Sequence, residues 1–204
     1  MYSENSLKAI ENVLNKDYID GIEIDVRMTK DKKIVLIHDP VIDLISNGSG
    51  IVKYMNFDDL NKYQYGKSKE SIITLDNLLD IINTDKIILI EIKEFGNDFI
   101  NLVDETIKII SKHNLNIYIS SFNYQLLNYV KSKYKNVKCG LIIGYGLNLI
   151  HFKNNLDFNI VSYHYYKQVD SSKLTFIFNL DKNNYELNHN AYLVTDTSFK
   201  FNKI

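Results

Sequence analysis

Short apolar runs alternate along this chain with longer stretches in which apolar and polar residues follow a helical period. The short runs are rich in Ile and Val and are apolar at nearly every position, which is typical of strands buried on both faces of a sheet. These runs predict strands at residues 21–26, 33–38, 86–92, 117–122, 138–143, 159–163, 174–178 and 191–195.

The intervening stretches carry apolar residues three and four positions apart, which is the spacing of one helix face. They predict helices at residues 7–14, 75–82, 100–110, 124–134 and 147–154. Polar residues that can cap a helix precede the first three of these helices. They are residues 3–6, Thr74, and Asn97 with Asp98. Strands that alternate with helices predict an α/β fold built on a parallel sheet, either doubly wound or closed into a barrel.

One connection departs from this alternation. The first two predicted strands are too close in the chain for a crossover helix, because a parallel return needs a dozen residues or more. Residues 28–32 instead predict a turn, which makes residues 33–38 an inserted antiparallel strand. Without the inserted strand, seven parallel strands remain, one fewer than a (β/α)8 barrel contains.

The composition is that of a globular domain. Hydrophobic residues make up 45% of the 204 residues and charged residues 24%, which excludes wholesale disorder. No linker divides the chain, so we expect a single domain over residues 1–204, with an inserted strand and loop at about residues 28–73. The formal net charge of −1 and the lack of a basic stripe argue against nucleic acid as a partner.

Several motifs and segments are absent from the sequence, and their absence bears on the cellular location of the protein and on the classes of chemistry it can perform. No apolar run approaches the roughly 18 residues of a membrane span, and residues 1–5 have no signal-peptide pattern, so we expect a cytoplasmic protein. The single cysteine, Cys139, excludes a disulfide framework and a cysteine-based zinc site, and its place in a predicted strand indicates inert core. Dinucleotide-binding, P-loop and nucleophilic-serine motifs are absent as well.

The choice of polar residues is biased. The chain has 23 lysines but one arginine, Arg27, and it is rich in Asn, Ile and Tyr, all of which have AT-rich codons. We attribute this bias to the genome. A lysine or an asparagine therefore carries less information than usual, whereas an arginine, a histidine or a glutamate carries more.

Three carboxylates interrupt the apolar strands toward their carboxyl ends, where barrel and open α/β enzymes keep their sites. Glu23 and Asp25 share one face of their strand, and Glu91 shares a face with Lys93 in another. Such carboxylates on neighbouring strands would repel strongly without a cation, and oxygen ligands without cysteine select Mg²⁺ or Ca²⁺. The alternative is an ion-pair network in which Lys93 and Arg27 neutralise the carboxylates, and the pattern by itself leaves both open.

His38, which ends the inserted strand and precedes Asp39, is a candidate general acid or base. Histidine is the side chain that titrates nearest to neutral pH, although a lone histidine also serves structural roles. His164 lies just past a strand, on the side where a site would form, and the tyrosines beside it are expected to pack or to form a rim. The remaining histidines are weaker candidates: His113, His151 and His189.

Taken in order, these segments resemble the glycerophosphodiester phosphodiesterase family of phospholipase-C-like barrels. The most specific block is residues 21–31, with the sequence GIEIDVRMTKD, and it is followed by the block at residues 35–40 that contains His38 and Asp39. The other matching blocks, in family order, are residues 4–10, 47–50 with 57–60, 74–75, 90–93, 120–122 and 194–196. The resemblance runs from residue 4 to about residue 196.

The resemblance implies a fold and a reaction. The implied fold is a (β/α)8 TIM barrel of the phospholipase-C-like phosphodiesterase type, with residues 33–38 in the insertion after its second strand. The implied reaction is the metal-dependent hydrolysis of a glycerophosphodiester, a small-molecule substrate, to an alcohol and sn-glycerol 3-phosphate.

The resemblance also implies roles for residues at matching positions. Glu23, Asp25 and Glu91 would ligate the divalent cation, Mg²⁺ or Ca²⁺. His38 would be one of two catalytic histidines, and Lys93 would face the phosphate or the metal-bound oxygens.

The sequence departs from the family at its start. The family begins with a strand that ends in His-Arg-Gly, and this chain has no counterpart of that strand, of its catalytic histidine or of its arginine. We therefore expect a barrel that is missing or opened at its first strand, and a chain that is slow or inactive. A catalytically impaired member that binds phosphate esters is the alternative function. The edges of the strands at residues 21–26 and 191–195 would be unpaired, and association through them is an expected hazard.

Overall fold

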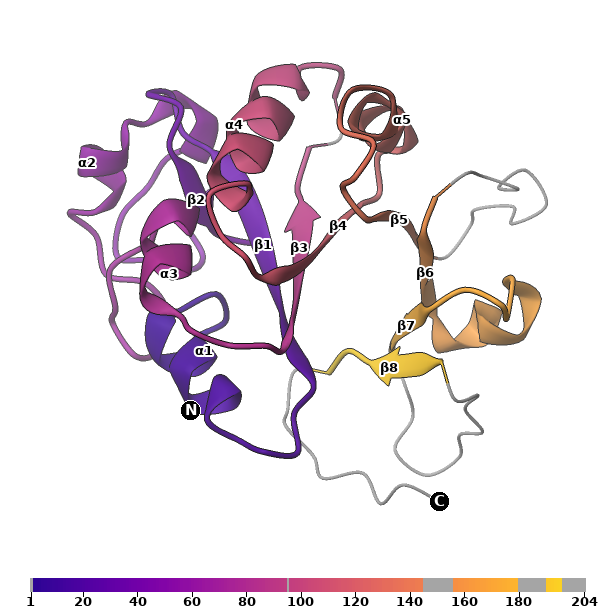
Figure 1. The fold of residues 1–204 in the computed structure, drawn as a ribbon. Helices are drawn as coiled ribbons and strands as arrows, with labels where there is room; N and C mark the ends of the chain where they lie inside the picture. The colour runs from indigo at the N-terminus through magenta and orange to yellow at the C-terminus, as the bar shows by residue number, and fades with distance from the viewer. Residues whose placement is uncertain (1, 95, 145–155, 180–189, 196–204) are drawn as a thin grey trace. The chain divides into compact units, whose positions relative to one another are not determined.

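The computed structural model describes residues 2–94, 96–144, 156–179 and 190–195 of the chain (Figure 1). The chain forms two compact units, Met1–Ile117 and Tyr118–Ile204. The expectation of a single domain over residues 1–204 stays a prediction.

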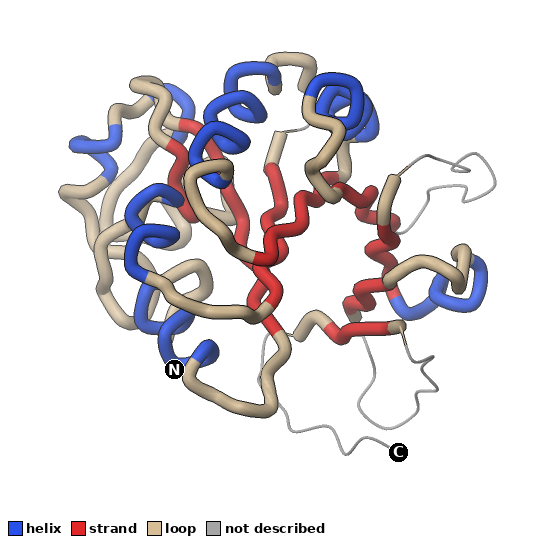
Figure 2. The backbone as a smooth tube through the Cα atoms, viewed as in Figure 1, coloured by secondary structure: helices blue, strands red, loops and turns tan. Residues whose placement is uncertain are grey.

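Helices and strands alternate in both units, as the hydrophobic pattern predicts (Figure 2). The elements of the first unit are α1 (Leu7–Leu14), β1 (Gly21–Met28), β2 (Ile34–Leu36), η1 (Val52–Tyr54), α2 (Phe57–Leu60), α3 (Leu75–Ile81), β3 (Ile87–Ile92) and α4 (Ile100–Ile110). Strand β4 (Asn116–Ser121) leads into the second unit, which contains α5 (Tyr124–Lys133), β5 (Cys139–Ile143), β6 (Phe158–Ser162), η3 (Tyr163–Gln168), β7 (Thr175–Phe178) and β8 (Ala191–Leu193).

All of the predicted strands form, each within a few residues of its expected bounds. Four of the five predicted helices form, and the fifth, at residues 147–154, lies outside the described residues. The α/β fold class is therefore confirmed. None of the helices in the described ranges is long and apolar enough to cross a membrane.

Two of the three helix starts for which the sequence suggested capping residues have a side-chain cap. Ser6 accepts a hydrogen bond from the Ala9 amide at the start of α1, and Thr74 accepts one from the Asn77 amide at the start of α3. Such a side chain satisfies a backbone donor that has no partner within the helix. Helix α4 instead takes Phe99 as its N-cap residue, which makes no side-chain cap.

Strand β1 lies between two neighbours that run in opposite directions. It pairs antiparallel with β2 through Val26↔Leu36 and parallel with β3 from Gly21↔Ile87 to Val26↔Ile92. The turn between β1 and β2 is closed by a 2.9 Å hydrogen bond from the Thr29 amide to the Lys33 carbonyl. This arrangement confirms that the second strand is an antiparallel insertion.

The inserted segment between β1 and α3 has an apolar cluster of its own. Its buried members are Val35, Ile37, Ile42, Val52, Leu60 and Ile72. Because these residues anchor the loop on both sides of His38, the segment is packed rather than loosely attached, and the position of His38 depends on that packing.

The second unit builds its sheet from successive parallel pairs, β4 with β5, β5 with β6, β6 with β7, and β7 with β8. The rings of Tyr118, Phe158 and Phe176, from β4, β6 and β7, meet edge to face with centroids 5.3 to 5.8 Å apart, a favourable arrangement of aromatic rings. Cys139 is buried, and burial raises the pKa of its thiol to about 12, so it is a core residue as predicted.

Candidate active site

Asp25 and Glu91 lie directly opposite each other on the parallel strands β1 and β3. Glu23 precedes Asp25 by two residues and therefore projects from the same face of β1. One carboxylate oxygen from each of the three residues lies within 4.8 Å of those of the other two. Within the part of the chain that the structure describes, this is the one group of acidic, histidine or cysteine side chains with such spacing.

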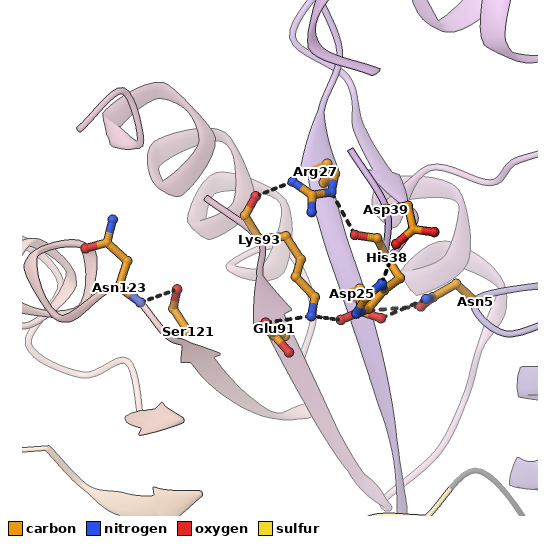
Figure 3. Close-up of polar contacts among 9 residues, drawn as sticks. All are labelled: Asn5, Asp25, Arg27, His38, Asp39, Glu91, Lys93, Ser121 and Asn123. Atoms are coloured by element: carbon orange, nitrogen blue, oxygen red, sulfur yellow. Dashed lines mark hydrogen bonds and ion pairs between the residues drawn. The ribbon is translucent and has the colours of Figure 1, made fainter. Parts of the chain in front are cut away.

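Lys93 connects two of these carboxylates. Its Nζ atom lies 3.1 Å from Asp25 Oδ1 and 2.8 Å from Glu91 Oε1 (Figure 3). The three side chains are only 7%, 9% and 10% exposed, respectively, so these ion pairs are shielded from water and from salt. Part of the predicted ion-pair network therefore exists, and it coexists with the carboxylate cluster.

The two partners of this ion pair respond to burial differently. Desolvation is the largest influence on the pKa of Glu91, which is raised on balance although the hydrogen bond and the charge of Lys93 act to lower it. Desolvation also acts to lower the pKa of Lys93, but the attraction of Asp25 and Glu91 outweighs it, and the net pKa is raised. The ammonium group of Lys93 thus offsets only part of the effect of burial on Glu91.

The pKa of Glu23 is also affected by the neighbouring carboxylates. Its pKa is raised well above the ordinary value, first by desolvation and then by the charges of Asp25 and Glu91. Both causes act in the same direction, and the raised pKa marks a place where a further cation would be stabilising.

The hydrogen bonds of Arg27 go to main-chain carbonyls, although the charges of Glu94, Asp25, Asp39 and Glu91 also act on its guanidinium. Its Nε group donates a 2.9 Å hydrogen bond to the carbonyl of His38, and its Nη1 group donates another of 2.9 Å to the carbonyl of Lys93 (Figure 3). The guanidinium thus contacts the main chain of two predicted site residues.

Asn5 is a site residue that sequence reasoning missed. Its Nδ2 group donates a 2.9 Å hydrogen bond to Asp25 Oδ2, and its Oδ1 atom accepts one of 2.9 Å from the Asp25 amide. Its backbone φ of 54° lies in the left-handed region, which asparagine tolerates better than most residues. The signal in the sequence is the family-like block at residues 4–10, in which Asn5 stands, but the abundance of asparagine in the chain obscured it.

His38 lies just beyond the end of β2, beside the cluster of Asp25, Glu91 and Lys93 in Figure 3. Its Nδ1 atom is 2.8 Å from Asp39 Oδ1, and both side chains are at least one-third exposed. A charged carboxylate can only accept a hydrogen bond, so this contact requires the proton on Nδ1 and leaves Nε2 of a neutral ring as an acceptor. His38 can therefore reach solvent or a ligand with Nε2.

The donor set fits a hard divalent cation. Two oxygens that share one ion cannot be farther apart than twice the metal–oxygen distance, which is about 4.2 Å for Mg²⁺ and about 5 Å for Ca²⁺. The 4.8 Å limit on the carboxylate spacing is close to this range. Formally, Lys93 balances one of the three negative charges of Glu23, Asp25 and Glu91, and a divalent cation would balance the other two.

The other histidines named from the sequence lie elsewhere or outside the described residues. His113 follows the end of α4, with Nε2 3.7 Å from Asp80 Oδ1. His164 is an exposed residue of η3 in the second unit. Two predicted positions lie outside the described residues: His151 and His189.

Comparison with known proteins gives one family. Residues 1–195 match the model of the "Glycerophosphoryl diester phosphodiesterase family". A glycerophosphodiester phosphodiesterase from Caldanaerobacter subterraneus subsp. tengcongensis is 33% identical over 153 residues, which cover 71% of this chain and 63% of that protein. A second curated relative, from Bacillus subtilis, is 28% identical over 68% of this chain and 60% of its own length. The chain thus spans less than two-thirds of these relatives.

Solved structures agree with this match. The glycerophosphodiester phosphodiesterase from Thermotoga maritima has a TM-score of 0.70 at 25% identity, over 89% of this chain and 81% of that one. A phosphodiesterase from Oleispira antarctica, solved in complex with the product sn-glycerol-3-phosphate, also has a TM-score of 0.70, at 18% identity over 80% of this chain and 74% of that one. These likenesses confirm the prediction of an α/β fold of the family's TIM-barrel type.

Proposed function

Because this chain belongs to the glycerophosphodiester phosphodiesterase family, we propose that it hydrolyses glycerophosphodiesters, with a divalent cation, to an alcohol and sn-glycerol 3-phosphate. The observation that carries the proposal is the cluster of Glu23, Asp25 and Glu91, whose oxygens lie within 4.8 Å of one another. Beside this cluster, Lys93 supplies a positively charged ammonium group and His38 supplies an imidazole. The product bound by the Oleispira relative is the one proposed for this chain.

The three carboxylates are the proposed ligands of Mg²⁺ or Ca²⁺. When bound, the cation would neutralise the charge of the phosphodiester and help to orient the attacking oxygen. Asp25 is held for this role by Asn5, and Glu91 by its position opposite Asp25 in the β1–β3 ladder. Ligands that are fixed before binding lose little entropy when the ion arrives.

Lys93 has a second role in this proposal. Its ammonium group balances Asp25 and Glu91, and it can turn toward a phosphate oxygen once another cation balances those carboxylates. Lysine binds phosphate as a compact point charge with three donors. The shielding of its side chain from water strengthens that contact relative to one on the surface.

His38 is the proposed proton carrier. With its Nδ1 proton directed to Asp39, its Nε2 atom can accept a proton from a water or hydroxyl nucleophile, or return one to the leaving alkoxide. Such proton transfer contributes about 10² to 10⁴-fold to a rate. One histidine serves one of the two transfers, and the second requires another group or water.

An assay of product separates this proposal from its competitors. The chain is incubated with glycerophosphocholine and Mg²⁺ or Ca²⁺, and the products are identified by phosphorus NMR. We expect sn-glycerol 3-phosphate, with a loss of product in Glu91→Gln and no loss in Glu105→Gln, a control in the exposed ion pair with Lys108. A cyclic phosphate would indicate attack by a substrate hydroxyl in place of water.

The alternative function is that of an impaired family member, which would bind a phosphate ester without turnover. Binding of sn-glycerol 3-phosphate in the presence of Ca²⁺, with no product formed in the assay above, would favour this function. Cytoplasmic location stays a prediction in either case.

A further inference from the structure

We propose that Arg27 is a positioning residue, a two-donor clamp that holds His38 and Lys93 in register through their main-chain carbonyls. The inference deepens the proposed function, because it assigns Arg27 the task of aligning the proton carrier with the phosphate-facing ammonium group. It rests on two contacts, the 2.9 Å hydrogen bond from Nε to the His38 carbonyl and the 2.9 Å hydrogen bond from Nη1 to the Lys93 carbonyl.

The clamp acts where the backbone ladder stops. On one side of β1 the Ile37 amide donates to the Asp25 carbonyl over 3.0 Å, and on the other side the Lys93 amide donates to the Val26 carbonyl over 3.1 Å. Both named strands have already ended, because β2 ends at Leu36 and β3 at Ile92. Just beyond these strand ends, the main-chain carbonyls of His38 and Lys93 accept hydrogen bonds from the Arg27 side chain. The guanidinium group thus connects the two neighbouring segments to β1 where the backbone hydrogen bonds between strands end.

Arginine suits this task and lysine does not. The guanidinium group is planar and rigid, and its N–H groups point in several fixed directions, so that two acceptors on opposite neighbours can be held at a defined separation. A lysine ammonium group is a single point on a flexible stem. The chain has 23 lysines and one arginine. That arginine lies where one side chain must donate to two separate carbonyls, and genome bias does not explain its presence there.

Both hydrogen bonds of Arg27 end on the main chain, which distinguishes the clamp from a group that binds phosphate directly. A carbonyl held by a charged donor restricts the backbone of its residue, and the side chains of His38 and Lys93 start from those restricted positions. A shift of about 1 Å in a catalytic group can cost about 10²-fold in rate. The expected consequence of losing the clamp is therefore a fall in kcat with little change in metal binding.

A first test needs no substrate. The Nε–H group of arginine gives its own signal in ¹H–¹⁵N NMR, and with a single arginine the spectrum of the whole chain contains one such signal. We expect this signal to exchange slowly with water and to stay in place when inorganic phosphate is added with Ca²⁺. Exchange as fast as that of free arginine, or a shift upon addition of phosphate, overturns the clamp.

A second test compares Arg27→Lys, which keeps the charge, with Arg27→Met, which keeps the bulk. Lys112→Met serves as the matched control, because Lys112 makes an exposed 2.7 Å ion pair with Asp76 outside the site. We expect both Arg27 variants to bind Ca²⁺ as the parent does, to lose about 10²-fold in kcat, and to show shifted imidazole signals of His38. Full activity in Arg27→Lys, or a loss of metal binding that parallels the loss of activity, contradicts positioning.

The two readouts separate the clamp from the proposed reaction. If the parent chain forms no product, the proposed function fails, yet the Arg27 and His38 signals still report on the clamp. If the parent chain is active and the His38 signals of Arg27→Met match those of the parent, the clamp fails while the function stands.

Discussion

Asn5 holds Asp25 at two points, donating a 2.9 Å hydrogen bond to its carboxylate and accepting one of 2.9 Å from its amide. The contact joins the loop before α1 to β1 across 20 positions of sequence. It leaves Asp25 Oδ1 to the ion pair with Lys93. A ligand oriented by such a partner binds its ion with less reorganisation.

Replacing Asn5 with glycine tests this relationship. Glycine removes the side chain and accepts the φ of 54° without strain. We expect the affinity for Ca²⁺, measured by calorimetry, to fall about 10 to 100-fold, as for other partners of metal ligands. Lys69→Gly is the control, since Lys69 also has a positive φ, of 53°, on an exposed loop. Equal affinities in Asn5→Gly and the parent would remove Asn5 from the site.

Lys93→Met should separate stability from metal binding. The substitution leaves Asp25 and Glu91 buried without their ammonium partner, and breaking a buried pair in this way costs about 3–5 kcal/mol of unfolding free energy. Because the cluster becomes more negative, we expect Ca²⁺ to raise the melting temperature of Lys93→Met by more than that of the parent. The exposed Lys112→Met should respond as the parent does. A smaller response in Lys93→Met than in the parent would show that the ammonium group does not compete with the cation.

Metal affinity should rise with pH. The pKa of Glu23 is raised above its ordinary value of 4.5 by desolvation and by the neighbouring carboxylates, and that of Glu91 is raised chiefly by desolvation. In the metal-free protein these groups therefore contribute stability below about 4.5 that is lost as the pH rises through their folded-state pKa values. A ligand must be deprotonated to bind, so Ca²⁺ binding should release protons within this window.

Calorimetry in two buffers of different ionisation enthalpy counts those protons. We expect proton release in the parent and less release in Glu23→Gln, whose side chain cannot titrate. Asp43→Asn serves as a control, because Asp43 is an exposed acid held by Ser49 and Gly50 outside the cluster. Absence of proton release across the window would mean that the carboxylates are already ionised before the metal binds.

His38→Gln should lower the rate and leave the metal in place. Glutamine cannot carry the proton, so we expect kcat to fall about 10² to 10⁴-fold with unchanged Ca²⁺ affinity. His113→Gln is a matched control. His113 follows the end of α4 and, like His38, lies near an aspartate, in this case Asp80 of α3. If both variants keep the parent rate, His38 is not the proton carrier.

Gly21→Ala should destabilise the strand pair that carries the carboxylates. A Cβ atom at Gly21 would overlap the Ile87 carbonyl oxygen and lie 2.8 Å from Ile87 Cβ, and a paired backbone has little room to move. We expect a loss of about 1–3 kcal/mol in unfolding free energy by urea denaturation. Gly144→Ala, whose Cβ would meet a Phe122 ring carbon at an ordinary 3.5 Å, should change it little.

Much of this fold could be predicted because its signals are local. The Ile- and Val-rich runs predict β1 and β3, and the short turn after Met28 predicts that β2 is antiparallel. Alternation of side chains places Glu23 and Asp25 on one face whatever the rest of the chain does. Family resemblance then selected the barrel from the two α/β architectures that the pattern allowed.

The partners of Arg27, Asn5 and Lys93 could not be predicted in the same way. The sequence by itself determined which side chains share a face, because that depends on the two-residue period of a single strand. Only the tertiary structure decided that Asp25 lies opposite Glu91, 66 positions away, since register is set by packing between distant strands. From that register follow the ion pairs of Lys93 and the hydrogen bonds of Arg27 to two carbonyls, which the sequence pattern did not predict.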